Sequence, residues 1–216
     1  MNWKHAVLAF LLALFSLIMV VPLFNYLSIL AISTIMELLL LLIALLVGRI
    51  GLPWSELIQK LGLRKPSAKW LSISLLGGVL AWVSAVILSV VVYTIFPYPP
   101  GMAEASSSIF IQSSLLDSVL WTIHVFVFVG FCEEMLFRGV IQRGFEESIP
   151  KRWIAVLISS ILFGAIHLDV RGLLPRALLG AVFGYLYIKS DYNIVVPSIA
   201  HGLNDFIGIV LINYIL

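Results

Sequence analysis

Residues 70–96 have the sequence WLSISLLGGVLAWVSAVILSVVVYTIF, without a single charged side chain. A helix needs about 20 apolar residues to cross the hydrocarbon core of a bilayer, so this stretch predicts a membrane-spanning helix. The whole chain has the same character, since 62% of its 216 residues are hydrophobic and only 11% are charged. Soluble domains carry about 25% charged residues, and one of this size could not bury so much apolar surface. The chain is therefore predicted to be an integral membrane protein.

About seven apolar segments predict an all-α fold, a polytopic bundle of transmembrane helices. They are expected at residues 6–27, 31–47, 70–96, from about 118 onward, 153–168, 173–188 and 194–216. The fifth and sixth are short for a full crossing. The first follows Lys4 as a signal peptide would, but no small-x-small cleavage motif comes after it, so it is expected to be retained.

These segments are expected to form one integrated membrane domain with two regions. Residues 1–115 supply the first three spans and a short amphipathic segment, 53–69, on the cytoplasmic side. Four apolar residues of that segment fall on one helical face, as in a helix that lies among lipid headgroups: Trp54, Leu57, Ile58 and Leu61. Residues 116–216 contain three polar motifs and are expected to be the catalytic core.

Lysine and arginine are distributed unevenly between the two ends of the predicted bundle. If the amino terminus is cytoplasmic, eleven of them lie inside: Lys4, Arg49, Lys60, Arg64, Lys65, Lys69, Arg138, Arg143, Lys151, Arg152 and Lys189. Only Arg171 and Arg176 lie outside. Cytoplasmic loops are enriched in these residues, which predicts a multi-pass protein of a bacterial-type plasma membrane with a cytoplasmic amino terminus. The net charge of +2 gives no reason to expect a nucleic-acid partner.

Three polar clusters interrupt the apolar helices of the second region, where ionisable groups are costly and often functional. In the first cluster, Glu134 and Arg138 are four residues apart, so they share a helix face and are predicted to pair. Glu133 points about 100° away from its neighbour in an α-helix, which leaves its carboxylate free for chemistry. The alternative interpretation is a polar helix end that protrudes into the cytoplasm.

The second and third clusters contain the histidines. Phe163 and His167 are one turn apart, and His201 is one turn before Asp205, with Asn204 at the edge of the same face. Each cluster alone is more typical of packing, or of a helix end that satisfies its own hydrogen bonds, than of catalysis. The three together are far more specific.

The depths of the clusters also fit one another. Glu133 lies seventeen residues before Pro150, the expected tip of a hairpin, and His167 lies seventeen residues after it. Both are therefore about 25 Å from that tip. His201 is about 15 Å from the next tip, at Asp191, so the three residues meet if the first hairpin projects about 10 Å further into the cytoplasm.

The three motifs, in this order and each on a hydrophobic helix, resemble those of the CPBP intramembrane proteases. They are Glu-Glu-x-x-x-Arg at 133–138, Phe-x-x-x-His at 163–167 and His-x-x-x-Asn/Asp at 201–205. The family includes the type II CAAX prenyl endopeptidases and the bacteriocin-processing or bacteriocin-immunity proteins of the Abi group. The resemblance covers residues 116–216. Asp205 is a variant, because the prenyl endopeptidases have Asn there, although the family pattern tolerates either.

This resemblance implies an intramembrane endopeptidase that hydrolyses membrane-associated or lipidated proteins and peptides, of the CAAX type or the bacteriocin type. By motif position, Glu133 would activate a water molecule with His167 and His201 nearby, and Asp205 would be the orienting partner. Four residues would support the site: Glu134, Arg138, Phe163 and Asn204. Family members are described as metalloproteases and also as enzymes whose glutamate activates water without a metal.

No cofactor is fixed by the sequence. Glu133, His167 and His201 together could hold a divalent metal such as zinc and leave one position open. The zinc-binding helix motif His-Glu-x-x-His is absent, which slightly favours the metal-independent form. The expected partners are a protein or peptide substrate and the lipids of the membrane.

Three other polar residues are weaker candidates. Cys132, the only cysteine, lies in an apolar helix that disfavours the thiolate, so it is expected to be buried rather than nucleophilic. His124 is nine residues before Glu133, which puts it on the opposite face of an α-helix and excludes it from the site. Glu37, in the second span, could pair with an interior polar group.

Two other functions stay open. A non-catalytic membrane scaffold or bacteriocin-immunity factor of the same family would keep its cellular role after Glu133 or His167 is replaced by Ala. A proton-coupled transporter would also place Glu, His and Asp inside the membrane. The sequence has no inverted repeat and no paired broken helices, which weakens the transporter interpretation.

Overall fold

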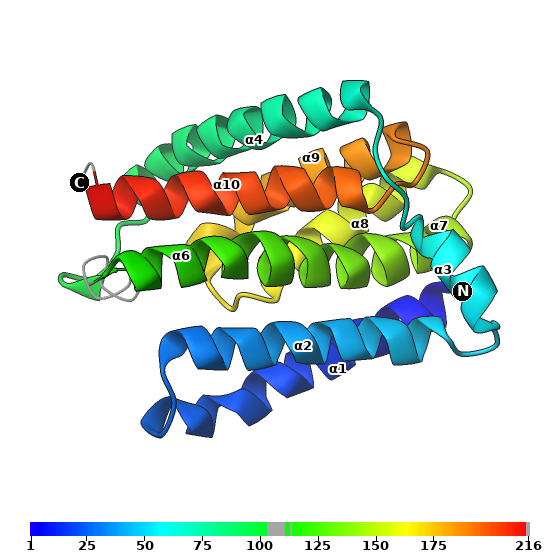
Figure 1. Cartoon of the computed structure of the whole chain (residues 1–216), viewed down its shortest axis with the longest axis horizontal. Coiled ribbons are helices and arrows are strands. Elements are labelled where there is room, and N and C mark those ends of the chain that lie inside the picture. Colours follow the sequence, from blue (N-terminus) through cyan, green and yellow to red (C-terminus); the bar gives the residue numbers. More distant parts are fainter. Residues whose placement is uncertain (103–110, 113, 215–216) are drawn as a thin grey trace.

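The computed structural model of the chain describes residues 1–102, 111–112 and 114–214. These residues form a bundle of helices without a strand among them (Figure 1). The helices are α1 Trp3–Val20, η1 Val21–Asn25, α2 Ile29–Gly48, α3 Trp54–Leu61, α4 Ala68–Ile95, α6 Leu115–Ile123, η2 His124–Glu133, η3 Met135–Gln142, α7 Arg143–Glu146, α8 Arg152–Ala165, α9 Val170–Lys189 and α10 Val195–Tyr214. Here η1 is a 3₁₀ turn, and η2 and η3 are π-helical.

The all-α membrane fold predicted from the sequence is confirmed, and each of the seven expected segments is helical. Five helices are long and apolar enough to cross a membrane: Trp3–Asn25, Ile29–Gly48, Ala68–Ile95, Leu115–Glu146 and Val195–Asn213. The other two expected spans are α8, with only 14 residues, and α9, which carries two arginines in its first half. These two helices form a hairpin and pack against each other along their length (Figure 1).

Small residues allow the helices around this hairpin to approach closely, as is common inside membranes. A Cβ atom on Gly180 of α9 would lie 2.9 Å from the Cα atom of Ser160 in α8. In the same way, a Cβ atom on Gly78 of α4 would lie 2.6 Å from a carbonyl oxygen of α10, and one on Gly130 of η2 would lie 2.7 Å from another. Helix α10 is therefore held tightly between α4 and η2.

The fourth span differs from the regular α-helix that the sequence predicted. It begins as α6, continues through η2 and η3 with i→i+5 hydrogen bonds, and returns to an α-helix in α7. Such π-helical geometry is rare, usually lasts a single turn, and is frequent at functional sites. The wider turn changes which residues share a face, so the angles expected for this span from 3.6 residues per turn do not hold.

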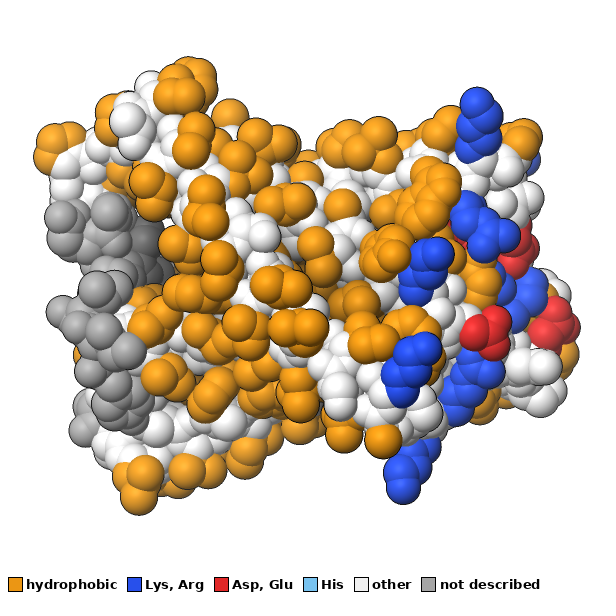
Figure 2. Space-filling model, turned by 90° about the horizontal axis from the view of Figure 1, so that it is seen from above, with side chains coloured by type: hydrophobic (Ala, Val, Ile, Leu, Met, Phe, Trp, Pro, Cys, Tyr) orange, Lys and Arg blue, Asp and Glu red, His pale blue; other side chains and the backbone are white. Residues whose placement is uncertain are grey.

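Basic side chains gather at one end of the bundle, where α3 and the α7–α8 and α9–α10 turns lie (Figure 2). We call this the basic end and define it by nine residues: Arg49, Lys60, Arg64, Lys65, Lys69, Arg143, Lys151, Arg152 and Lys189. Arg138 had been counted with them from the sequence, but it is fully buried inside the bundle. The expected hairpin tips are confirmed, because helices end on both sides of Pro150 and of Asp191.

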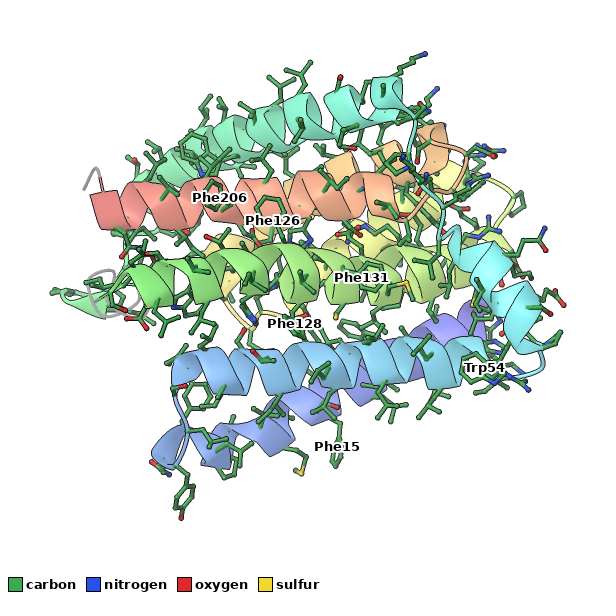
Figure 3. The ribbon with its side chains drawn as sticks, viewed as in Figure 1. Phe15, Trp54, Phe126, Phe128, Phe131 and Phe206 are labelled. Atoms are coloured by element: carbon green, nitrogen blue, oxygen red, sulfur yellow. The ribbon has the colours of Figure 1, made fainter. Side chains whose placement is uncertain are left out.

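The amphipathic segment of the sequence is the short helix α3 at the basic end. Leu57 and Leu61 are fully buried, the first beside Gly48 and the second beside Gly139. Trp54 and Ile58 are half exposed (Trp54 is labelled in Figure 3). The predicted apolar face is thus divided, because its two leucines pack on the bundle while the other two side chains stay available to the headgroup region.

Candidate active site

Arg138 is the anchor of the polar interior. Its Nη1 atom donates to Oε1 of Glu134 at 2.9 Å, and its Nη2 atom donates to the carbonyl oxygen of Gly180 at 2.9 Å. The guanidinium also lies over the rings of Phe163 and Phe183, with centroid distances of 4.7 and 5.6 Å. The predicted pair between Glu134 and Arg138 is therefore present, and it joins η3 to α8 and α9.

Glu134 also holds a histidine, which the sequence did not indicate. The Nδ1 atom of His201 lies 2.9 Å from the same Oε1 atom that Arg138 binds. The imidazole is stacked on Phe183, with ring centroids 4.7 Å apart. Because a carboxylate only accepts hydrogen bonds, Nδ1 carries the proton in this contact and fixes the orientation of the ring.

The other nitrogen of His201 faces the remaining carboxylates. Its Nε2 atom lies 3.4 Å from Oδ2 of Asp205 and 4.0 Å from Oε2 of Glu133. Asn204 donates from Nδ2 to Oδ1 of Asp205 at 2.8 Å, which positions that carboxylate. The Oε2 atom of Glu133 and the Oδ1 atom of Asn204 are buried without a hydrogen-bond partner among the described residues. The structure thus brings the first and third motifs into direct contact.

The second motif reaches the same space from the turn after α8. The Nδ1 atom of His167 donates to the carbonyl oxygen of Phe163 at 3.0 Å, and the two rings meet edge to face. This bond leaves Nε2 as the accepting nitrogen of a neutral imidazole. His167 lines the cavity beside Glu133, but no hydrogen bond joins the two. Phe163 packs against Arg138 and His201, so its predicted supporting position agrees with the structure.

These groups line a cavity of about 540 Å³. Its polar wall contains the expected residues Glu133, His167, Asn204 and Asp205. Its apolar wall comes mainly from α4, η2 and α10: Trp82, Ala85, Val86, Trp121, Val125, Val129, Ile209 and Ile212. A cavity of this size, apolar with a few convergent polar groups, is the usual form of a ligand site. The aromatic pair Phe126 and Phe206, labelled in Figure 3, packs η2 against α10 beside it.

The proposed metal ligands do not fit an ion in this arrangement. Within residues 1–102, 111–112 and 114–214, no three His, Cys, Asp or Glu side chains meet as metal ligands would. His201 is already engaged on one side by Glu134 and faces Asp205 on the other.

Two residues that line the cavity, His124 and Glu37, were not predicted as site residues from the sequence. His124 was excluded as lying opposite Glu133, but both line the cavity, because nine residues cover about two turns of a π-helix rather than two and a half of an α-helix. Ser33 and Thr34 of α2 bond its two ring nitrogens at 2.8 and 3.2 Å. Glu37, one turn after Ser33, is buried in the same wall, and its Oε2 atom has no hydrogen-bond partner among the described residues.

Cys132 is buried, as the sequence predicted, and it is absent from the cavity lining. Glu37 could have been assigned to the site from the sequence, because it is the single acidic residue of an otherwise uncharged span. The structure therefore adds a carboxylate from the first region of the chain to a site otherwise built from the second.

Comparison with known proteins gives two kinds of match, one to a family and one to individual proteins. The type II CAAX prenyl endopeptidase Rce1-like family matches residues 112–207. The protein named "Putative membrane peptidase YdiL" of Bacillus subtilis is 32% identical over 114 residues, which are 52% of this chain and 46% of that protein. The "Uncharacterized 24.3 kDa protein" of Escherichia coli is 29% identical over 109 residues, 49% of this chain and 48% of that protein.

The chain spans about half the length of the curated relatives it matches. No solved structure matches it. The matched segment nevertheless contains all three motifs, and these motifs form one buried cluster in the fold. Residues 112–207 of the chain are therefore similar to the type II CAAX prenyl endopeptidase Rce1-like family.

Proposed function

We propose that this chain is an intramembrane endopeptidase in which Glu133 activates a water molecule. The observation that carries the proposal is the position of this carboxylate. It is buried, its Oε2 atom has no hydrogen-bond partner among the described residues and lies 4.0 Å from His201, and it lines a cavity together with His167. The similarity of residues 112–207 to the Rce1-like prenyl endopeptidases supports the same reaction class.

The chemistry needs an acceptor for a proton of water, a donor to the developing oxyanion, and a proton for the leaving amine. In the proposed reaction, Glu133 takes a proton from water as the oxygen bonds to the carbonyl carbon. His201, held by Glu134 and Asp205, acts as an imidazolium with a proton on each ring nitrogen and donates from Nε2 to the oxyanion. When the carbon–nitrogen bond breaks, the proton on Glu133 passes to the amine, directly or through Nε2 of His167. Arg138 holds Glu134 in place.

The proposed substrates are membrane-associated or lipidated polypeptides. Purified protein in lipid vesicles should cleave at least one of two probes, a farnesylated peptide with a CAAX carboxy terminus or an unmodified membrane-spanning peptide. A chelator titration in the same assay separates the two mechanisms, because a zinc enzyme would lose activity and regain it with added zinc. A second experiment compares all peptides found in cells with and without the gene. If neither probe is cleaved and this comparison shows no difference, the chain is instead a scaffold or immunity factor.

Glu37 is expected to contribute to substrate binding, because its free oxygen faces the cavity opposite the catalytic cluster. Changing Glu37 to Leu should lower kcat/KM about tenfold, mostly through KM, since a lost hydrogen bond of about 1.4 kcal/mol has this effect. Glu37→Gln should lose less, because the amide oxygen still accepts. Met36→Leu on the same helix is the matched control. Unchanged kinetics of Glu37→Leu would remove this residue from the site.

A further inference from the structure

The cavity lies entirely on one side of the catalytic cluster. Along the fourth span its lining runs from Glu133 in η2 to Trp121 in α6, and along α10 it runs from Asn204 to Ile212. Helix α10 starts at the basic end, and the fourth span runs towards it, so both walls lead away from that end. The parts of α2 and α4 that line the cavity also lie away from the basic end. Ser33 and Glu37 are in the half of α2 far from Arg49, and residues 82–89 are in the second half of α4.

The opposite side of the cluster is closed by packed side chains. Met135, Phe137, Gln142 and Tyr187 are at most 1% exposed and fill the space between the cluster and the basic end. Arg138 and its contacts to Glu134 and Gly180 complete this layer. A substrate could therefore approach Glu133 from the basic end only if this part of the core came apart.

The short hairpin of α8 and α9 explains why space is left on the far side. Helix α8 has 14 residues and is about 21 Å long, whereas α4 has 28 residues and is about 42 Å long. The turn between α8 and α9 lies short of the end of the bundle at which the carboxy terminus is drawn (Figure 1). His167 is on this turn, and the space beyond it is enclosed by the longer helices α2, α4 and α10 and by the fourth span.

We propose that the substrate reaches Glu133 from the extracytoplasmic half of the membrane, as an inserted segment of an exported or membrane-bound polypeptide. The proposal rests on the proposed peptidase function and on the basic end being cytoplasmic, as the distribution of Lys and Arg indicates. A lipidated carboxy terminus presented from the cytoplasm would meet the closed face of the cluster. The cavity walls contain both apolar residues, such as Trp82 and Ile209, and hydroxyl groups, Ser33 and Ser89, which suits an extended peptide whose backbone needs hydrogen bonds inside the bilayer.

Thiol accessibility tests the direction of access without depending on activity. Cys132→Ala removes the native thiol, and single cysteines are then placed at Ser89 in the cavity wall, at Arg64 on the basic end and at Ser160 in the core. A charged, membrane-impermeant maleimide is added to intact cells and, separately, to sealed inverted vesicles. We expect Ser89→Cys to be labelled in intact cells alone, Arg64→Cys in inverted vesicles alone, and Ser160→Cys only after denaturation.

Labelling of Ser89→Cys only in inverted vesicles, or in neither preparation, would overturn the proposal. Labelling of Arg64→Cys in intact cells would overturn it too, since the basic end would then be outside. In purified protein, maleimide on Ser89→Cys should also abolish cleavage of the membrane-spanning peptide. If the labelling pattern is as expected but no peptide is cleaved by the unlabelled protein, the peptidase function fails while the direction of access stands.

Discussion

Replacing Glu133 with Gln is expected to lower kcat for peptide cleavage by about 10²- to 10⁴-fold, the usual contribution of a general base. The amide has the size of the carboxyl group but cannot take the proton of the attacking water. The bundle should stay folded, because Oε2 of Glu133 makes no hydrogen bond to a described residue that the substitution would remove. The measurements are cleavage of peptides in lipid vesicles and thermal unfolding in detergent.

The control for this variant is Glu56→Gln, which makes the same chemical change on α3, outside the cavity. It should keep full activity and the same unfolding temperature. Peptide binding by Glu133→Gln should persist, since the proposed role concerns the reaction rather than affinity. A Glu133→Gln protein that cleaves at the normal rate would contradict the glutamate mechanism. The chelator titration would then show whether cleavage requires a metal.

The sequence was sufficient to predict several of the residues that lie together in this site, for two physical reasons. Ionisable side chains are so costly at membrane depth that Glu133, His167 and His201 stand out against an apolar background. The spacing of four between Glu134 and Arg138 then determines which carboxylate pairs with the cation, and this pair is present at 2.9 Å. The catalytic roles of these residues remain predictions, because geometry places groups without measuring turnover.

The errors came from local helix geometry and from packing between distant segments. Apolar periodicity does not reveal whether a turn closes over i→i+4 or i→i+5 bonds, so His124 was placed on the wrong side of its helix. Glu37 lies on a span outside the matched residues, and no motif links its position to that of Glu133. The contact between Glu134 and His201 likewise depends on how closely α10 packs against η2, which Gly130 and Gly202 permit.

Replacing Arg138 with Ala is expected to lower the free energy of unfolding by about 3–5 kcal/mol, the usual cost of breaking a buried ion pair. The guanidinium is fully buried, and its loss would leave the carboxylate of Glu134 without its cation and the carbonyl of Gly180 without its donor. It would also remove the group that packs on Phe163 and Phe183. The measurement is unfolding in detergent, together with the amount of folded protein recovered from membranes.

A double variant tests whether the stranded charge of Glu134 is what destabilises Arg138→Ala. Removing only the cation strands a buried carboxylate, whereas Glu134→Gln combined with Arg138→Met removes both charges and keeps much of the side-chain volume. This pair should therefore unfold at a higher temperature than Arg138→Ala alone. It should still be less active, because the neutral amide can accept from Nδ1 of His201 but lacks the negative charge that stabilises a protonated imidazole. If the double variant is no more stable than Arg138→Ala, the stranded charge is not the cause of the destabilisation, and the lost hydrogen bond from Arg138 to Gly180 is.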